Sequence, residues 1–246
     1  MSFFKNCPPW NKCYLFLLLL LLLPGCASVS IKSICFGDGA PQKLPDRIYV
    51  EQFKAPPLYF HVNRKGKDLK ELIAQEQLHL AQDLILRLNK HIAPTVLLPP
   101  GVTPPQGNYW LVRGSFEVVN EGSRLLRAGL GFGLGKTKME TTAQLLDLSK
   151  TYPELLLTIT TTGGSGIAPG AAAAFAPIAP LTLPTTLLNV GGSAGGALGT
   201  GISVDRRRTA REIVATISEY SVQHGLITKA RGLHPKRLGE IPPLFY

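Results

Sequence analysis

Charged residues are scarce in this chain of 246 residues. Asp, Glu, Lys and Arg together make up 17% of the sequence, whereas apolar residues make up 45%. A disordered chain is usually rich in charge and poor in apolar residues. The composition therefore argues against a disordered protein, and the length suits one folded domain with accessory segments.

Acidic residues are fewer than basic residues. Sixteen Asp and Glu stand against 26 Lys and Arg, which gives a formal net charge of +10. A basic balance of this kind suits an anionic surface, such as phospholipid or lipopolysaccharide headgroups. The basic residues are scattered and form no motif interleaved with aromatic residues, so we do not expect nucleic-acid binding.

Metal-binding patterns are absent from the sequence. Its five histidines lie far apart, with no pair four residues apart and no cysteine partner. This spacing does not indicate a metal site, and we expect no cofactor.

An apolar run long enough for a transmembrane helix is missing near the N-terminus. Residues 14–23 are uninterrupted apolar residues that follow Lys5 and Lys12. Ten helical residues span about 15 Å, half of a hydrocarbon core that is about 30 Å thick. The run suits the apolar core of a signal peptide, so residues 1–25 are expected to be an export signal.

The apolar run leads to a cysteine. Leu23, Pro24, Gly25 and Cys26 resemble a lipobox, in which an aliphatic residue, a small position and glycine precede the cysteine. The thiol can form a thioether to diacylglycerol, and acyl chains such as palmitate anchor a protein durably. The alternative is a plain secretory signal with an incidental cysteine. Ala27 in place of Asp favours the outer membrane, with the protein facing the periplasm.

Cysteine is rare, with four in the chain. Cys7 and Cys13 would leave with the signal and Cys26 would carry lipid, so Cys35 would remain as a lone thiol. It could form an intermolecular disulfide or stay unpaired. Residues 26–45 are punctuated by glycine and proline and are predicted to be a lipidated tether.

The patterns after the tether predict a single α/β (α+β) domain over residues 46–230 and a C-terminal tail over 231–246. The predicted architecture is one mostly antiparallel sheet packed by two helices. Helices are predicted at about 68–91, capped by Asp68, and 205–224, followed by Gly225. Strands are predicted at 47–53, 95–98, 109–119, 124–134, 136–148 and 155–162.

Three arginines, Arg206, Arg207 and Arg208, fall in the first turn of the second predicted helix. The helix dipole disfavours cations at this end. We therefore expect acidic partners for them, or an anionic surface nearby.

Charge is absent altogether from residues 155–204, which also lack histidine. Within this stretch, residues 163–201 form an apolar insertion rich in Gly, Ala and Pro. Its prolines exclude an ordinary transmembrane helix. The insertion is either a long flexible loop or an apolar hairpin that enters a membrane or contacts neighbouring copies.

Two motifs resemble catalytic or binding sequences. Residues 129–137 end like a phosphate-binding loop, but Leu130 replaces a required glycine, so we expect no nucleotide binding. Ser193 lies in a G-x-S-x-G pattern, with Asp205 and His224 following in the order of a hydrolase triad. The surrounding residues lack the strand–turn–helix pattern of that site. We expect no enzyme, with a serine hydrolase using Ser193 as the minor alternative.

A family resemblance rests on residues 122–136. Gly122, Arg124, Arg127 and the glycine-rich residues 131–136 resemble the signature of bacterial lipoproteins grouped as domain of unknown function 4410. The lipobox and the predicted elements fit the same pattern over roughly residues 46–230. The resemblance implies an envelope lipoprotein and adds no activity.

Arg124 and Arg127 are the candidate site residues. They could bind an anionic ligand, or they could pair with Glu117, Glu121 and Glu140 on neighbouring strands. We expect a non-catalytic, membrane-anchored module that binds an envelope protein or forms a homo-oligomer. The alternative is an oligomeric outer-membrane channel or secretion-associated lipoprotein whose apolar segments enter the membrane.

Overall fold

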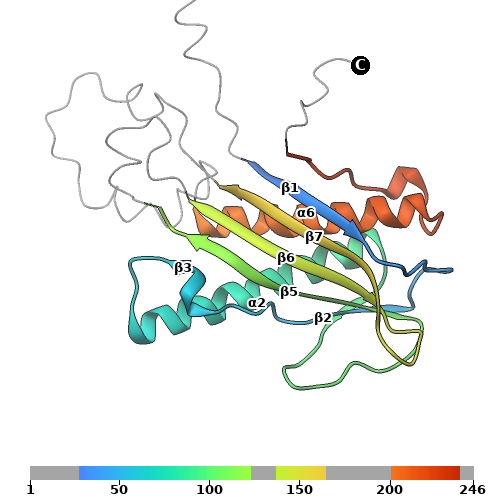
Figure 1. The fold of residues 1–246 in the computed structure, drawn as a ribbon, viewed down its shortest axis with the longest axis horizontal. Coiled ribbons are helices and arrows are strands. Elements are labelled where there is room, and N and C mark those ends of the chain that lie inside the picture. Colours follow the sequence, from blue (N-terminus) through green and yellow to red (C-terminus); the bar gives the residue numbers. More distant parts are fainter. Residues whose placement is uncertain (1–27, 123–136, 165–200, 239–246) are drawn as a thin grey trace, which may run out of the picture.

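The structure is a computed structural model that describes residues 28–122, 137–164 and 201–238. In these ranges the chain forms one mixed seven-stranded sheet with two long helices packed against one of its faces (Figure 1). The α+β fold predicted from the sequence is confirmed. The elements are β1 (Ser28–Phe36), β2 (Arg47–Val50), the short 3₁₀ helix η1 (Pro57–Tyr59), β3 (Phe60–His61), α2 (Gly66–His91), β4 (Thr95–Leu97), β5 (Tyr109–Asn120), β6 (Lys138–Asp147), β7 (Glu154–Gly164), α6 (Ile202–Gln223) and η2 (Lys229–Arg231).

The sheet is mostly antiparallel, with parallel pairing at one edge. Its strand order is β1-β7-β6-β5-β2-β4, and β3 pairs with the end of β5. The first four strands in this order pair antiparallel, whereas β2 lies parallel to both β4 and β5. Parallel neighbours need a long crossover connection. Helix α2 supplies it, because it follows β2 in the chain and leads into β4.

The core lies between the sheet and the two helices. Alternate side chains of β5 point into it, among them Val112 and Phe116, which are fully buried. Helix α2 contributes an apolar stripe at helical spacing that includes Leu80, Leu84 and Leu88. Side chains that repeat every two residues in the strands and every 3.6 residues in the helices therefore face one shared core.

Both helices begin earlier than their patterns predict. Helix α2 begins at Gly66, and Asp68 makes no capping hydrogen bond. Asp68 lies instead in the first turn, where the helix dipole favours a carboxylate. Helix α6 begins at Ile202, so Asp205 also lies inside the helix. Gly225, which follows α6, has a φ of +69°, as predicted for a glycine that ends a helix.

The prediction of a tether over residues 26–45 is wrong for the residues that form β1. This strand pairs with β7 along its length, beginning with Ser28 opposite Gly164. Val29 and Ile31 are 1% and 3% exposed, so the strand contributes to the core. A β-bulge after Ile31 interrupts the alternation of apolar and polar residues. The interruption explains why a period-two pattern does not reveal the strand.

The C-terminal residues reach the outer edge of β1. The backbone N–H of Ile31 donates to the carbonyl oxygen of Lys236 at 2.7 Å, and the N–H of Leu238 donates to the carbonyl oxygen of Ile31 at 3.0 Å. The described part of the predicted tail is therefore joined to the sheet. It covers a strand edge that could otherwise pair with another chain.

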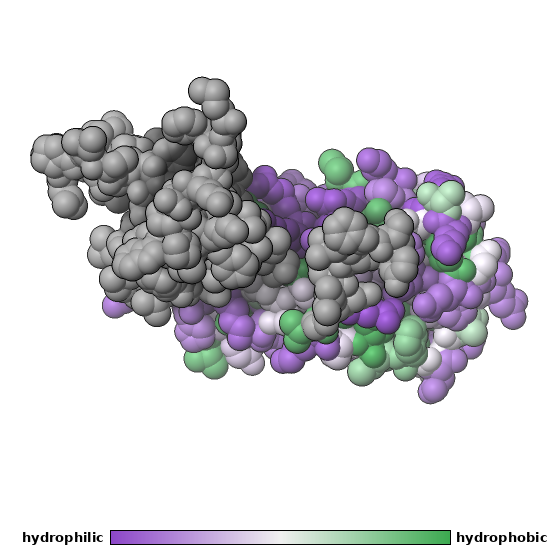
Figure 2. Space-filling view, turned by 90° about the horizontal axis from the view of Figure 1, so that it is seen from above, coloured by the Kyte–Doolittle hydropathy of each residue, from purple (hydrophilic) through white to green (hydrophobic). Residues whose placement is uncertain are grey.

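Two predicted segments fall largely outside the described residues, namely the strand at 124–134 and the insertion at 163–201. Gly163 and Gly164, the first residues of the insertion, form the end of β7. Neither long helix in the described ranges is apolar enough to cross a bilayer. On the side of the molecule shown in Figure 2, hydrophilic residues cover most of the described surface.

A substitution in β1 distinguishes a core strand from a tether. Ile31→Ala should lower the free energy of unfolding by about 2–4 kcal/mol, because it leaves a cavity in the core. The exposed Ser33→Ala, two residues away, should change it by less than about 0.5 kcal/mol. Urea unfolding followed by circular dichroism measures both. Equal stability of the two variants would contradict the burial of β1.

Candidate functional site

The lipobox residues Leu23, Pro24, Gly25 and Cys26 lie outside the described part of the chain. Strand β1 nevertheless begins at Ser28, two residues after the cysteine. Two residues of extended chain span at most about 7 Å. A lipid on Cys26 would therefore lie next to the first residue of the sheet.

Several ends of the described segments meet at this end of the sheet (Figure 1). Ser28 pairs with Gly164, the last residue of β7. Lys138, the first residue of β6, pairs with Asn120, the last residue of β5. The breaks before residue 28, after 122 and after 164 consequently lie at one end of the fold.

A buried hydrogen bond joins the start of α6 to the same end. The hydroxyl of Thr137 donates to Oδ2 of Asp205 at 2.5 Å, and both side chains are buried. Gly164 allows the close approach of β7, because an added Cβ would lie 1.8 Å from the carbonyl oxygen of Thr137. Thr137 is the last residue of the sequence that resembles a phosphate-binding loop. Its hydroxyl is bound to a carboxylate here.

The minor alternative, a triad of Ser193, Asp205 and His224, finds no support in the part of the chain that the structure describes. Asp205 and His224 lie at opposite ends of α6, nineteen residues apart, which corresponds to about 28 Å along a helix. Nδ1 of His224 lies 2.9 Å from the carbonyl oxygen of Tyr220. Ser193 lies outside the described residues. The helix predicted over residues 205–224 already places these two side chains at its opposite ends, and α6 confirms that separation.

Arg124 and Arg127 also lie outside the described residues, so their predicted pairing stays a prediction. Their expected partners have other contacts. Glu117 accepts a hydrogen bond from the hydroxyl of Ser115 at 2.5 Å, and Glu121 lies 3.9 Å from Nη2 of Arg64.

Glu140, the third expected partner, has two described contacts of its own. Lys138 lies 3.1 Å away, and the hydroxyl of Thr162 donates to it at 2.7 Å. Burial raises the pKa of this carboxyl, but the bonds from Thr162 and Lys138 and the charge of Lys32 outweigh burial, and the pKa lies below its usual value. Glu140 is therefore an ionised, well-bound carboxylate.

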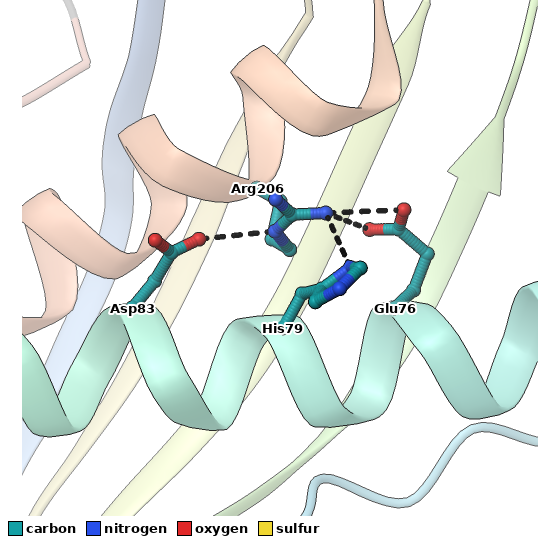
Figure 3. A network of polar contacts seen from close by, with 4 residues as sticks. All are labelled: Glu76, His79, Asp83 and Arg206. Carbon is teal, nitrogen blue, oxygen red and sulfur yellow. Dashed lines mark hydrogen bonds and ion pairs between the residues drawn. The ribbon is translucent and has the colours of Figure 1, made fainter.

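A buried ionic network joins the two helices (Figure 3). Nη1 of Arg206 lies 3.1 and 3.2 Å from the carboxylate oxygens of Glu76, and its Nε lies 3.0 Å from Asp83. Nδ1 of His79 lies 3.4 Å from the same Nη1. Arg206 and Glu76 are 8% and 6% exposed. The acidic partners predicted for the arginines of α6 are confirmed for Arg206.

The partners on α2 could not be identified from the arginines alone, because 130 residues separate Arg206 from Glu76. A signal was nevertheless present in α2. Glu76 and Asp83 are seven residues apart, so both lie on one face of the helix, beside the apolar stripe. Two acids in that position are typical of a face that binds a cation on a neighbouring element.

The face of the sheet opposite the helices is polar at mid-length of β5 and β6 and carries a small apolar cluster of Leu98, Leu111, Leu146 and Leu148. Arg113, Ser115, Thr142 and Gln144 lie on this face, because they alternate with the core residues Val112, Phe116 and Ala143 along β5 and β6. These strands place Arg113 opposite Gln144 and Ser115 opposite Thr142. Within the described ranges, no group of His, Cys, Asp or Glu could hold a metal ion.

The sequence profile of one family matches residues 48–180, and its description is "Domain of unknown function (DUF4410)". The match covers more than half of the chain. No curated protein matches the chain significantly.

Solved structures of PelC from Paraburkholderia phytofirmans resemble this fold weakly. A PelC dodecamer is 12% identical, with 61% of this chain and 88% of that chain covered at a TM-score of 0.35. A dodecamer of a single-residue PelC variant is 14% identical, with 61% and 87% covered at a TM-score of 0.32. Likeness at this level supports no conclusion about function.

The buried network yields a stability prediction with a matched control. Arg206→Ala should lower the free energy of unfolding by about 3–5 kcal/mol, because it leaves the carboxylate of Glu76 buried without its cation. Arg207→Ala, at the exposed neighbouring position, should change it by less than about 0.5 kcal/mol. Urea unfolding measures both variants. Similar values for the two would show that the network does not hold the helices together.

Proposed function

Since this chain belongs to the DUF4410 family, whose function is unknown, we propose a function from its own residues. The protein is a non-catalytic assembly module of the bacterial cell envelope, anchored in the outer membrane through a lipid on Cys26. It faces the periplasm and binds another envelope protein or further copies of itself.

The position of β1 is the observation that carries this proposal. The sheet begins two residues after Cys26, and β1 is held by β7 along its length. A lipid at that position would hold one end of the sheet against the bilayer without a long tether. The domain would then present a restricted set of orientations to its partners, which is useful in an assembly.

Features of the sequence support the anchor. An apolar run of signal-peptide length precedes Leu23, Pro24, Gly25 and Cys26. The basic balance of the chain suits an anionic lipid surface. Ala27 after the cysteine favours sorting to the outer membrane.

A second candidate function is an oligomeric channel or secretion-associated lipoprotein whose apolar insertion enters the membrane. One observation favours it. Gly164, which precedes the uncharged residues 165–200, pairs with Ser28, and Asp205 in the first turn of α6 binds Thr137 at the same end of the sheet. The insertion would therefore leave and rejoin the fold beside the lipid.

Cross-linking of native membranes separates the two candidates. A homo-oligomer that resists mild detergent would support the channel. Cross-linking to a different envelope protein would support the adaptor role.

The lipid anchor can be tested directly on the full precursor expressed in a bacterium. We expect the mature protein to begin at an acylated Cys26, which intact-mass spectrometry detects as the loss of residues 1–25 and the gain of acyl chains. Cys26→Ser should carry no acyl chain and should keep residues 1–25, because the atom to which the lipid attaches is gone.

Cys35→Ser is the matched control, since Cys35 is an exposed free thiol on β1. It should carry the acyl chains of the wild type and lack residues 1–25. A wild-type protein without fatty acid would overturn the proposal.

A further inference from the structure

A shallow hollow lies on the helix-free face of the sheet. Its volume is about 340 Å³, within the range of small-ligand sites. The segment after β2 lies beside β5, to which the backbone of Glu51 and Lys54 is hydrogen-bonded, and β6 lies on the other side of β5. The lining residues are Glu51, Lys54, Arg113, Gly114, Ser115, Thr142 and Gln144.

Three charged side chains of both signs line this hollow without pairing. Among the described residues, Glu51, Lys54 and Arg113 make no salt bridge with one another or with any other side chain. Elsewhere on the same sheet, opposite charges close into pairs, as Lys138 does with Glu140. The hollow therefore keeps one carboxylate and two cations open to a bound molecule.

The guanidinium of Arg113 is oriented by its neighbour. Its Nε donates to Oε1 of Gln144 at 3.1 Å across the β5–β6 pair. No hydrogen bond within the described chain uses its Nη atoms. A guanidinium held by its Nε presents those remaining donors as a fork, which suits the two oxygens of a carboxylate or phosphate.

The lining selects a ligand by its charges. A simple anion at Arg113 and Lys54 would also face Glu51, and a simple cation at Glu51 would face the two basic side chains. A molecule with both charges satisfies all three groups. Thr142 adds a hydroxyl beside them, and none of the described residues that line the hollow is aromatic.

We propose that this hollow binds a small zwitterion, with a phosphate or carboxylate at Arg113 and Lys54 and an ammonium group at Glu51. The site lies at mid-length of the strands, away from the end of the sheet that is beside Cys26. Strand pairing aligns Ser115 with Thr142, Thr160 and Ser33, and Ser33 is five residues from Ser28, or about 17 Å. The proposal does not depend on the lipid anchor.

Titration of the isotope-labelled mature protein in a non-ionic detergent tests the proposal. The probes are O-phosphoethanolamine, inorganic phosphate, ethanolamine and β-alanine, and the readout is the chemical shift of backbone amides. We expect the amides of Gly114, Ser115 and Thr142 to shift with O-phosphoethanolamine. Phosphate and ethanolamine should each bind at least about tenfold more weakly, because phosphate leaves Glu51 without a partner and ethanolamine leaves Arg113 and Lys54 without one.

Two substitutions separate the roles of the charges. Arg113→Gln should weaken O-phosphoethanolamine about tenfold or more, since it removes the fork. Glu51→Gln should bring the affinities for O-phosphoethanolamine and phosphate to within about twofold, since it removes the partner of the ammonium. Arg47→Gln, at an exposed arginine that begins β2 outside the hollow, is the matched control and should bind like the wild type.

The outcomes decide the proposal without reference to membrane anchoring. The relative affinity of β-alanine shows whether the anionic group is a carboxylate or a phosphate. The proposal is overturned if Arg113→Gln, with a spectrum that shows a folded protein, binds as tightly as Arg47→Gln. A wild-type protein that binds phosphate as tightly as O-phosphoethanolamine would equally overturn it.

Discussion

The antiparallel pairing of β1 with β7 is the interaction on which the arrangement of this protein depends. It places Ser28 opposite Gly164, although more than 130 residues separate them in the chain. Together with the pairing of β6 with β5 and β7, it gathers the start of the domain, the two ends of the β5–β6 connection and the end of β7 at one end of the sheet. Each hydrogen bond of that ladder also satisfies a backbone N–H and a backbone C=O group that would otherwise bind water.

The helices are fixed to each other by a different kind of contact. Arg206 of α6 contacts two carboxylates of α2, of which Glu76 is buried and Asp83 is partly exposed. Burying such charges costs desolvation energy that the ion pairs offset only if their geometry is good. The network therefore adds selectivity for one helix alignment, because a shift of α6 by one turn would leave Arg206 and Glu76 buried and unpaired.

The β1–β7 pairing and the Arg206 network together make the two ends of the sheet, and its two faces, differ from each other. One end of the sheet lies beside the proposed lipid, one face is covered by the helices, and the other face is polar at mid-length of the central strands. The charged hollow belongs to that face, at mid-length of the strands. A module anchored at one end can in this way present that face to the periplasm.

Sequence patterns were sufficient to predict several of the helices and strands. The alternation in β5 and the helical stripes of α2 and α6 predicted those elements, since each buries a face on the core through local periodicity. The glycine at 225 likewise predicted where α6 ends. Strand β1 was not predicted, because its bulge breaks the alternation of apolar and polar residues and its partner strand β7 is distant in the chain.

The sequence by itself determined the periodicity of the strands and helices, the lipobox-like residues around Cys26 and the expectation of acidic partners or an anionic surface for Arg206. Local chemistry is sufficient for these features, because they depend on residues that are near one another in the chain. Only the tertiary structure decided that Glu76 and Asp83 are those partners of Arg206. It also decided that Glu51, Lys54 and Arg113 surround one hollow, since strand pairing and helix packing, rather than distance along the chain, bring such groups together.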